Sequence, residues 1–495
     1  MTKDQPESAS IADKTIFGLP LAVAFIVCYF AFQALLVTYV SNGAGVDDAE
    51  QLANIGYLDW GYGGSQPPLY TWISNLAASI FGTSMLTLQS VKFGVLASLF
   101  LSVFKAMRLL GFSRAVASAS MLGLFLIPQI GWESQRALTH SVAGTAACGW
   151  AFCAFAWHMR SPRPVSAALL GMTMVAAILG KFNASLFVAT LIVTGLSVAE
   201  YRKVLLSKLS IVTALAFAIC IAPTALWMLD HRSSVIARSE KLQIGTSGNL
   251  LLDRISGIES LIIAAFLFSV LVVAVAGIIA LLHRDKRLNA GHALTPGESF
   301  MRRILIVGLL VVLAGILTMG ITNIKDRWLQ PVLFLTPATL SCLLARYWRG
   351  DRSLTDFATM GVIAALLVPP VLSYYLVYGS SAPPYGQLDY QKLYTEIRSN
   401  GDFTTILADN PQIPGNFRLF DSDIRVIHSE TPIDAYKIEK PVLVMWFGDA
   451  TPNPAIMEIM NAANIAVPQT GVKTTTLAYR TDPHRQFTIS YFLAQ

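Results

Sequence analysis

The sequence predicts an α-helical polytopic membrane protein that ends in a small α/β soluble domain. Two observations predict the membrane body. Of the 495 residues, 54% are hydrophobic and 13% are charged, whereas soluble proteins carry about 25% charged residues. Apolar runs of about 20 residues, the length that spans a bilayer as a helix, recur up to residue 376. A third observation, the loss of these runs beyond residue 376, predicts the soluble domain.

About eleven transmembrane helices are expected in residues 1–376. The first run, residues 16–40, lacks a small-residue cleavage site and therefore predicts a retained helix rather than a signal peptide. Residues 180–183 leave room only for a tight turn between the fifth and sixth spans. The expected helix centres lie near residues 28, 95, 123, 150, 173, 191, 218, 270, 312, 338 and 366.

The distribution of the basic residues predicts how the chain is oriented in the membrane. With a cytoplasmic N-terminus, eighteen Lys and Arg residues fall on the cytoplasmic side and nine on the other. Positive residues collect in cytoplasmic loops, so an odd number of spans places the C-terminal domain outside. Because the basic residues form short clusters between apolar runs, the net charge of +6 does not indicate nucleic-acid binding. All the cysteines lie in apolar runs, so no disulfide is expected: Cys28, Cys148, Cys153, Cys220 and Cys342.

Residues 377–495 are expected to form the soluble domain. A Pro/Gly/Ser stretch at 379–386 predicts a linker. Residues 441–447 predict a buried strand, 454–465 a helix, and 474–480 with 486–494 a closing strand pair. The domain has no glycine-rich phosphate loop and no metal-ligand cluster, so a structural or acceptor-docking role is expected.

The first outer loop, residues 41–83, carries the most distinctive chemistry. Asp47, Asp48 and Glu50 lie within four residues just outside the first span. Carboxylates crowded together near an apolar boundary hold protons more readily than isolated ones. This favours general-base catalysis on a sugar or lipid hydroxyl. A solvated acidic loop, or a helix capped by Asp47, would explain the same residues.

The next segment of this loop predicts a helix lying in the membrane plane. Residues 66–72 read QPPLYTW, and the apolar stretch continues to residue 81, too short and too polar to span. Tyr70 and Trp72 are of the types that favour membrane interfaces. An interfacial helix beside a carboxylate cluster suits a lipid-linked substrate whose reactive bond lies at headgroup depth.

This combination resembles the GT-C glycosyltransferases, in the protein O-mannosyltransferase and lipid A aminoarabinose transferase branch. Within this branch, the segments DDAEQ (47–51) and QPPLYTW (66–72) are most similar to bacterial lipid A and core galacturonic acid transferases. The resemblance covers residues 14–376, is strongest over 45–75 and is weak over the tail. It implies an inverting enzyme of the bacterial inner membrane that moves a sugar from a polyprenyl-phosphate carrier to lipid A, lipopolysaccharide core or a related envelope glycan on the periplasmic face.

The resemblance also assigns roles. The first acid of the family's pair falls on Asp47, the expected base, and the second on Asp48. A further acid of the second outer loop falls on Glu133. Gln66 stands where a basic residue often precedes the two prolines, so another cation must hold the phosphate. No cofactor is expected, although the three loop carboxylates could hold a divalent metal.

Other outer polar residues are candidates for binding. Glu133 and Arg136 could instead form a simple ion pair. Lys181 could reach past a helix end to the lipid headgroups, and Arg327, in the Arg-aromatic-Leu-x-Pro segment 327–331, could be an interfacial anchor. Substrate-binding candidates are Glu50, Gln66, Tyr70, Arg136, His140, Lys181, His231 and Arg327, and phosphate-binding candidates are Lys181, Arg327 and Lys92. His231 belongs to a basic outer loop with Arg232, Arg238 and Lys241 that would attract an anionic lipid or sugar.

Three other functions remain open from the sequence: a protein O-glycosyltransferase or one acting on a capsule or O-antigen sugar, a lipid or sugar transporter or flippase, and a scaffold protein. Transporters usually place charges at mid-membrane and show repeated halves. Here the charges gather in outer loops and no repeat is found, which favours an enzyme.

Overall fold

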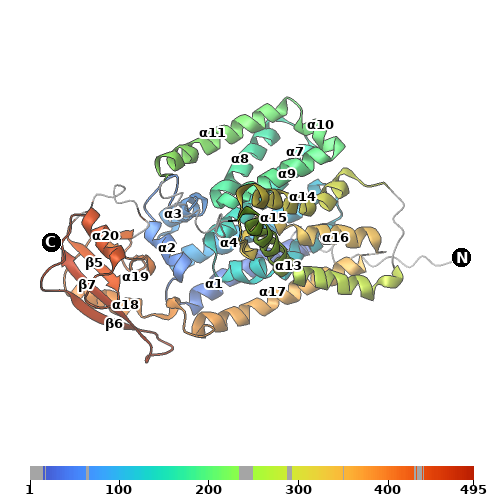
Figure 1. The fold of residues 1–495 in the computed structure, drawn as a ribbon. Helices are drawn as coiled ribbons and strands as arrows, with labels where there is room; N and C mark the ends of the chain where they lie inside the picture. Colours follow the sequence, from blue (N-terminus) through green and yellow to red (C-terminus); the bar gives the residue numbers. More distant parts are fainter. Residues whose placement is uncertain are drawn as a thin grey trace.

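The computed structural model describes residues 15–16, 18–62, 66–232, 249–286, 293–348, 351–428, 431, 438 and 440–494. A long helical bundle carries a soluble domain at one end, and α2 and α3 lie between the two (Figure 1). Most long helices present apolar side chains outward, such as Ile219, which is 71% exposed. Outward apolar side chains are what a bilayer requires of its spanning helices, so the protein is a multi-pass membrane protein.

Each of the eleven expected centres lies within a helix, but the count of eleven spans is not confirmed. Among the described residues, six helices are long and apolar enough to cross a membrane: α1 Leu21–Val40, α4 Met85–Leu109, α11 Leu209–Asp230, α13 Leu250–Leu282, α14 Pro296–Met319 and α17 Arg352–Tyr378. Two bent pairs, broken by 76° and 116°, raise the number to at most eight.

The remaining helices of the bundle are shorter or less apolar. The first bent pair comprises α5 Arg114–Leu122 with η2 Gly123–Leu126, followed by η3 Gln129–Glu133 with α6 Ser134–Arg136. The second comprises η4 Phe182–Ala184 with α9 Ser185–Ser197, followed by α10 Ala199–Leu205. The others are α7 Thr139–Arg160, α8 Pro164–Gly180, η6 Arg284–Lys286, η7 Asp326–Trp328, α15 Gln330–Leu333 and α16 Thr336–Tyr347, and a two-strand pair, β1 Thr15–Ile16 with β2 Leu19–Pro20, precedes α1.

The interfacial helix expected in the first outer loop is present as α3, Leu69–Phe81. Its buried side is formed by Tyr70, Ser74 and Ala78, while Phe81 is 75% exposed. The helix ends at Gly82, whose φ of 79° is a conformation that a residue without a Cβ adopts at little cost. This one-sided apolar helix has the pattern of a segment lying along a membrane surface.

The soluble domain is a five-stranded sheet with helices on both faces. The strand order is β4-β3-β5-β7-β6, with β3 parallel to β4 and β5, and β7 antiparallel to β5 and β6. Its strands are β3 Thr405–Ala408, β4 Arg425–His428, β5 Val442–Phe447, β6 Lys473–Ala478 and β7 Gln486–Ala494, and its helices are η8 Tyr385–Gln387, α18 Tyr390–Ser399, α19 Gln412–Phe417 and α20 Pro454–Ala462. Helices α18 and α19 pack on one face of the sheet and α20 on the other.

The expected linker at 379–386 is a fixed connection. The Gly386 carbonyl accepts hydrogen bonds from the backbone nitrogens of Asn42 (3.1 Å) and Gly43 (3.0 Å). The Gln387 side chain donates to the carbonyls of Val40 (3.1 Å) and Leu376 (2.9 Å). The start of the soluble domain is thus tied to the ends of α1 and α17, and the domain sits against the segment that follows α1.

Candidate active site

The acidic motif forms the helix α2, Val46–Asn54, and three of its faces are engaged by other parts of the protein. Side chains four residues apart share a face of a helix. Asp47 and Gln51 face the segment 138–140. Leu52 packs against α3 and α4, and Ala49 and Ala53 contact the soluble domain. Glu50 follows Val46 by one turn on the fourth side, where Val46 is 54% exposed.

Asp47 is held by the backbone at the entry to α7. Its Oδ2 accepts a hydrogen bond of 2.6 Å from the backbone nitrogen of Leu138. Leu138 has a φ of 69°, an uncommon left-handed conformation for a branched residue, at the entry to α7. Strained backbone of this kind persists where surrounding contacts fix it, and here the carboxylate is one of those contacts.

Asp48 points toward α4. Its Oδ2 accepts a hydrogen bond of 3.0 Å from Gln89 and lies 4.0 Å from Lys92 Nζ, whose side chain is 1% exposed. Lys92 is therefore the buried counterion of Asp48, and it lines neither of the two cavities described below. Its assignment to phosphate binding stays a prediction that this geometry does not support.

We expect the Asp48→Asn substitution to destabilise the protein, because it leaves the Lys92 ammonium buried without its counterion. Breaking such a pair costs about 3 kcal/mol. Gln89 can still donate a hydrogen bond to the oxygen of the new amide, so the substitution removes the charge of Asp48 and little else. The thermal midpoint in detergent should fall for Asp48→Asn and recover largely in Asp48→Asn/Lys92→Met. A single variant as stable as the wild type would show that the pair contributes nothing.

Gln51, which the sequence reasoning did not single out, joins α2 to two candidate residues. Its Nε2 lies 3.3 Å from His140 Nε2, and its Oε1 accepts a 2.9 Å hydrogen bond from Thr71. The His140 ring lies 6.0 Å from that of Tyr70, centroid to centroid. Both Gln51 and Tyr70 are fully buried. The sequence signals for Gln51 are its position one helical turn after Asp47 and its place at the end of the DDAEQ segment.

A first cavity of about 320 Å³, cavity A, opens beside this cluster. Its polar residues are Gln66, His140, Lys181 and Asn183, and its apolar wall comes mainly from α14 and the segment 321–329. A polar end beside an apolar wall suits an amphipathic ligand such as a lipid phosphate. Lining residues are Gln66, Pro67, His140, Lys181, Phe182, Asn183, Leu186, Val312, Gly315, Met319, Ile321, Ile324, Trp328 and Leu329.

Lys181 is placed in cavity A by a glycine crossing of α7 and α8. A Cβ on Gly180 would lie 2.6 Å from Gly144 Cα, so the two backbones touch. This brings Lys181 Nζ within 2.6 Å of Ser141 Oγ, to which it donates a hydrogen bond. Burial, together with the nearby positive charge of Arg327, lowers the pKa of Lys181 to about 8.

A second cavity of about 600 Å³, cavity B, lies on the other side of Leu138. Three cations line it, Arg136, Lys325 and Arg327, against the two acids Glu133 and Asp326. Gln129 donates a 2.5 Å hydrogen bond to Asp326 and so joins η3 to η7. The remaining lining residues are Leu138, Ile263, Ala264, Leu267 and Ile324. Leu138 lines cavity B and His140 lines cavity A, so the segment bound by α2 borders both cavities, and Ile324 lines both as well.

The comparisons with known proteins agree with this architecture. No family model matches the chain. The lipopolysaccharide core galacturonosyltransferase RgtB of Rhizobium johnstonii is 28% identical over 439 residues, which cover 86% of each chain. RgtA, a core galacturonosyltransferase of the same organism, is 26% identical over 479 residues, 93% of this chain and 94% of RgtA. The crystal structure of ArnT from Cupriavidus metallidurans bound to undecaprenyl phosphate shares the fold, with a TM-score of 0.55 and 12% identity over 95% of this chain and 98% of ArnT. Over most of its length the chain is therefore similar in sequence to the two galacturonosyltransferases, and it shares the fold of the ArnT structure.

Glu133 and Arg136 form an ion pair of 2.6 Å, the simpler of the two alternatives expected from the sequence. Arg136 also donates a 3.0 Å hydrogen bond to the hydroxyl of Tyr375. The pair is about one third exposed and faces cavity B. The structure thus places Glu133 at a substrate-sized cavity, while its catalytic role stays a prediction.

His231 lies apart from both cavities. Its ring stacks on Trp227 at 4.3 Å, and the Trp227 indole donates a 3.0 Å hydrogen bond to Asp59. Asp59, a carboxylate that the sequence reasoning missed, also accepts from Tyr57 at 2.8 Å. This network fixes the segment 57–62 against α11. Arg238 and Lys241 of the expected basic loop lie outside the described residues.

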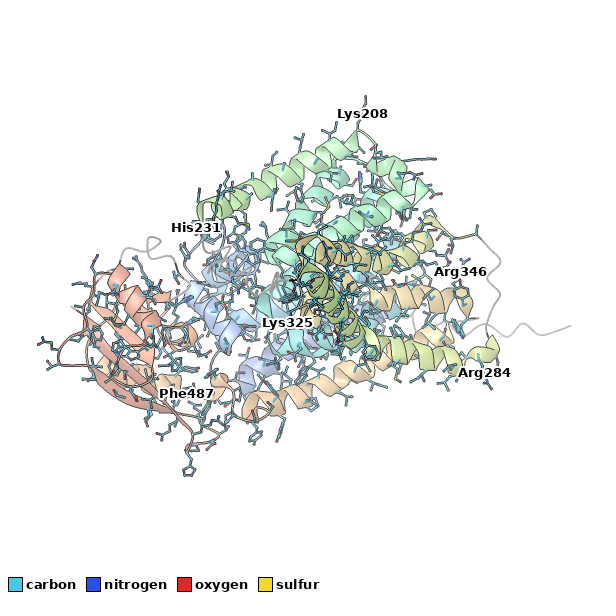
Figure 2. The ribbon with its side chains drawn as sticks, viewed as in Figure 1. Lys208, His231, Arg284, Lys325, Arg346 and Phe487 are labelled. Carbon is cyan, nitrogen blue, oxygen red and sulfur yellow. The ribbon has the colours of Figure 1, made fainter. Side chains whose placement is uncertain are left out.

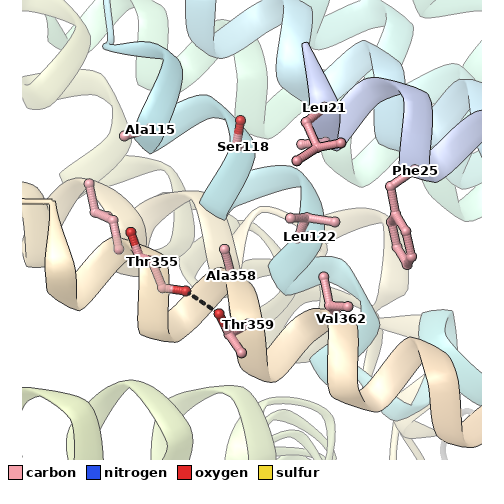
Figure 3. A pocket seen from close by; sticks show the side chains of 11 residues that line it. Leu21, Phe25, Ala115, Ser118, Leu122, Thr355, Ala358, Thr359 and Val362 are labelled. Atoms are coloured by element: carbon pink, nitrogen blue, oxygen red, sulfur yellow. Dashed lines mark hydrogen bonds between the residues drawn. The ribbon is translucent and has the colours of Figure 1, made fainter. Parts of the chain in front are cut away.

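A third cavity, of about 350 Å³, lies between α1, α5 and α17 (Figure 3). It is lined by apolar residues with Ser118, Thr355 and Thr359, and no charged side chain faces it. It lies toward the end of the bundle where α1 begins, away from α2. Without a carboxylate or a cation it offers no group for glycosyl transfer.

Proposed function

We propose that the enzyme transfers an anionic sugar of the galacturonic acid class from a polyprenyl-phosphate carrier to the lipopolysaccharide core or lipid A. The observation that carries the proposal is the position of Asp47. It is bonded to the segment that borders both a lysine-containing amphipathic cavity and a second, cation-lined cavity. A carrier lipid and a separate acceptor need two neighbouring cavities with a base close to both.

In the proposed reaction, cavity A holds the carrier and Lys181 holds its phosphate. Asp47 takes the proton of the acceptor hydroxyl as its oxygen attacks the anomeric carbon from the side opposite the phosphate. The bond from the anomeric carbon to the phosphate oxygen breaks, and the electron pair leaves with the polyprenyl phosphate. The anomeric configuration inverts. Lys181 stabilises the charge that develops on the leaving phosphate.

The cations of cavity B support an anionic acceptor or sugar. Arg136, Lys325 and Arg327 outnumber the two acids there, and an arginine can bind a carboxylate or phosphate with two parallel hydrogen bonds. The relatives RgtA and RgtB are named for transfer of galacturonic acid to the lipopolysaccharide core. The direct test is mass spectrometry of lipid A and core from a deletion strain. Loss of one hexuronic acid mass supports the proposal, and an unchanged profile contradicts it.

We propose that the end of the bundle with α2 and the soluble domain faces the periplasm. Arg284 and Arg346 lie at the opposite end (Figure 2), as the excess of positive residues on the cytoplasmic side requires. Labelling of single cysteines in intact cells checks this orientation. A cysteine at Thr475 should react with an impermeant maleimide, and one at Asp285 should not.

The affinity for the donor should fall as the pH rises through about 8. Lys181 has a lowered pKa of about 8 in the free enzyme, so it is charged below this pH and neutral above it. The phosphodiester of the donor keeps its single charge throughout. The Kd should be flat below pH 8 and rise toward tenfold per unit above it. In Lys181→Arg, whose side chain remains charged, the rise of Kd above pH 8 should vanish. A wild-type Kd that stays constant up to pH 9.5 would contradict the role of Lys181.

We also propose that no metal takes part. Among the described residues no group of three His, Cys, Asp or Glu side chains is placed to hold one. Activity of the purified enzyme should therefore survive EDTA within about twofold, whereas a loss that Mg²⁺, Mn²⁺ or Zn²⁺ restores would show a metal-dependent step.

A further inference from the structure

The soluble domain forms hydrogen bonds at both ends of α2, the helix that carries Asp47 and Asp48. At the start of α2, the Asn416 amide accepts a hydrogen bond from the Ala44 nitrogen (2.7 Å) and donates to the Ala44 carbonyl (3.2 Å). Gln412 donates to the same carbonyl at 2.9 Å. At the other end, Arg418 donates to the Ile55 carbonyl through Nη1.

These contacts come from α19 and from Arg418, the residue after it, and the interface is tightly packed. Asn416 is fully buried and Gln412 is 5% exposed. Between them, a Cβ on Gly415 would lie 2.2 Å from the Ala49 carbonyl oxygen, so α19 and α2 touch backbone to backbone. Ala53 belongs to the same apolar core as the helices α18 and α19.

The other side of α2 bears the carboxylates. Asp47 is bonded to Leu138 and Asp48 to Gln89, both in the membrane body. Nine residues are too few for a helix to be stable alone in water, so its position depends on what it packs against. The bundle and the soluble domain therefore both contact α2, and together they fix the position of its carboxylates.

We infer that the soluble domain is a positioning element for catalysis. A clamp formed by Gln412, Gly415, Asn416 and Arg418 fixes the position of α2 and thereby of the Asp47 carboxylate. This inference rests on the proposed function. In this account the domain does not need to bind a substrate. Its role is to keep the base within reach of the acceptor hydroxyl at the boundary between cavities A and B.

The clamp predicts a loss of kcat without a loss of binding. Asn416→Ala removes both bonds to Ala44, and Gly415→Ala forces α19 away from α2. A displacement of about 1 Å at a catalytic group can cost about 100-fold in rate. We expect kcat to fall tenfold or more in each variant, while KM for the donor and Kd for the carrier stay within about twofold, because no residue of α2 or α19 lines cavity A.

The matched control is Asn453→Ala in the same domain. Asn453 donates a 2.7 Å hydrogen bond to Asp409 and accepts from Ile456, on the α20 face and away from α2. It should lower the thermal midpoint of the domain but leave kcat within about twofold. If Asn416→Ala does not fold, Gln412→Ala, which keeps the Asn416 bonds, takes its place.

Two results would overturn the clamp: wild-type kcat in both Asn416→Ala and Gly415→Ala, or an equal loss of kcat in Asn453→Ala. Asp47→Asn is measured alongside. An inactive Asp47→Asn with fully active clamp variants removes only the clamp. An active Asp47→Asn instead removes the proposed base, whatever the clamp variants do.

Discussion

Asp47→Asn should reduce kcat by about 100- to 10,000-fold, the usual contribution of a general base. The substitution changes one oxygen to nitrogen and little else. The amide oxygen can still accept the hydrogen bond that Leu138 donates to the carboxylate at 2.6 Å. The helix and the strained entry to α7 should therefore remain in place, and only the ability to take a proton is lost.

The measurement is single-turnover transfer from a radiolabelled polyprenyl-phosphate sugar, with carrier binding measured in parallel. Binding should be unchanged, because Asp47 does not line cavity A. Residual activity above about a tenth of the wild type would exclude Asp47 as the base, since general bases contribute at least about 100-fold.

Lys181→Met and Lys325→Met should affect different substrates. Lys181 lines cavity A and Lys325 lines cavity B. A hydrogen bond to a charged group contributes about 1.5–3 kcal/mol, which corresponds to about 10- to 150-fold in affinity. Lys181→Met should raise the Kd for the polyprenyl-phosphate donor by that factor. Lys325, which is exposed, should give a smaller effect, and on the acceptor KM alone.

Each variant is the control of the other, because both remove one ammonium near the same end of the bundle. Equal effects of the two on donor affinity would mean that the cavities do not discriminate between substrates and that only the overall positive charge matters. Isothermal titration with the donor and initial rates at varied acceptor concentration separate the two parameters.

The features that local sequence determines were predicted well. The helix α3 begins at Leu69 directly after the two prolines, as expected, with Pro68 as its N-cap residue. The strand β5 and the helix α20 match the expected ranges closely, since a continuous apolar run and an Asn-Pro start are strong local signals. Lys181 lies at the predicted hairpin because Gly180 ends α8 there.

Features that depend on distant contacts were not predicted. The strands β3 and β4 and the helix α19 are short, and nothing in their sequence distinguishes them from loop. The partner of Asp47 is a backbone nitrogen 91 residues away, which leaves no trace in residue type. The same holds for the contact between Asn416 and Ala44, 372 residues apart. The count of eleven spans assumed straight helices, whereas the helices 114–126 and 129–136 are bent by 76° at the break that contains Pro128.

The most direct test is to photo-crosslink a polyprenyl-phosphate analogue, with the reactive group next to the phosphate, and to map the labelled peptides. Labels should fall on the segments 181–186 and 319–329, which line cavity A next to Lys181. They should disappear on competition with unlabelled carrier. Labelling confined to α5 and α17, around the uncharged third cavity, would place the carrier away from Asp47 and contradict the account.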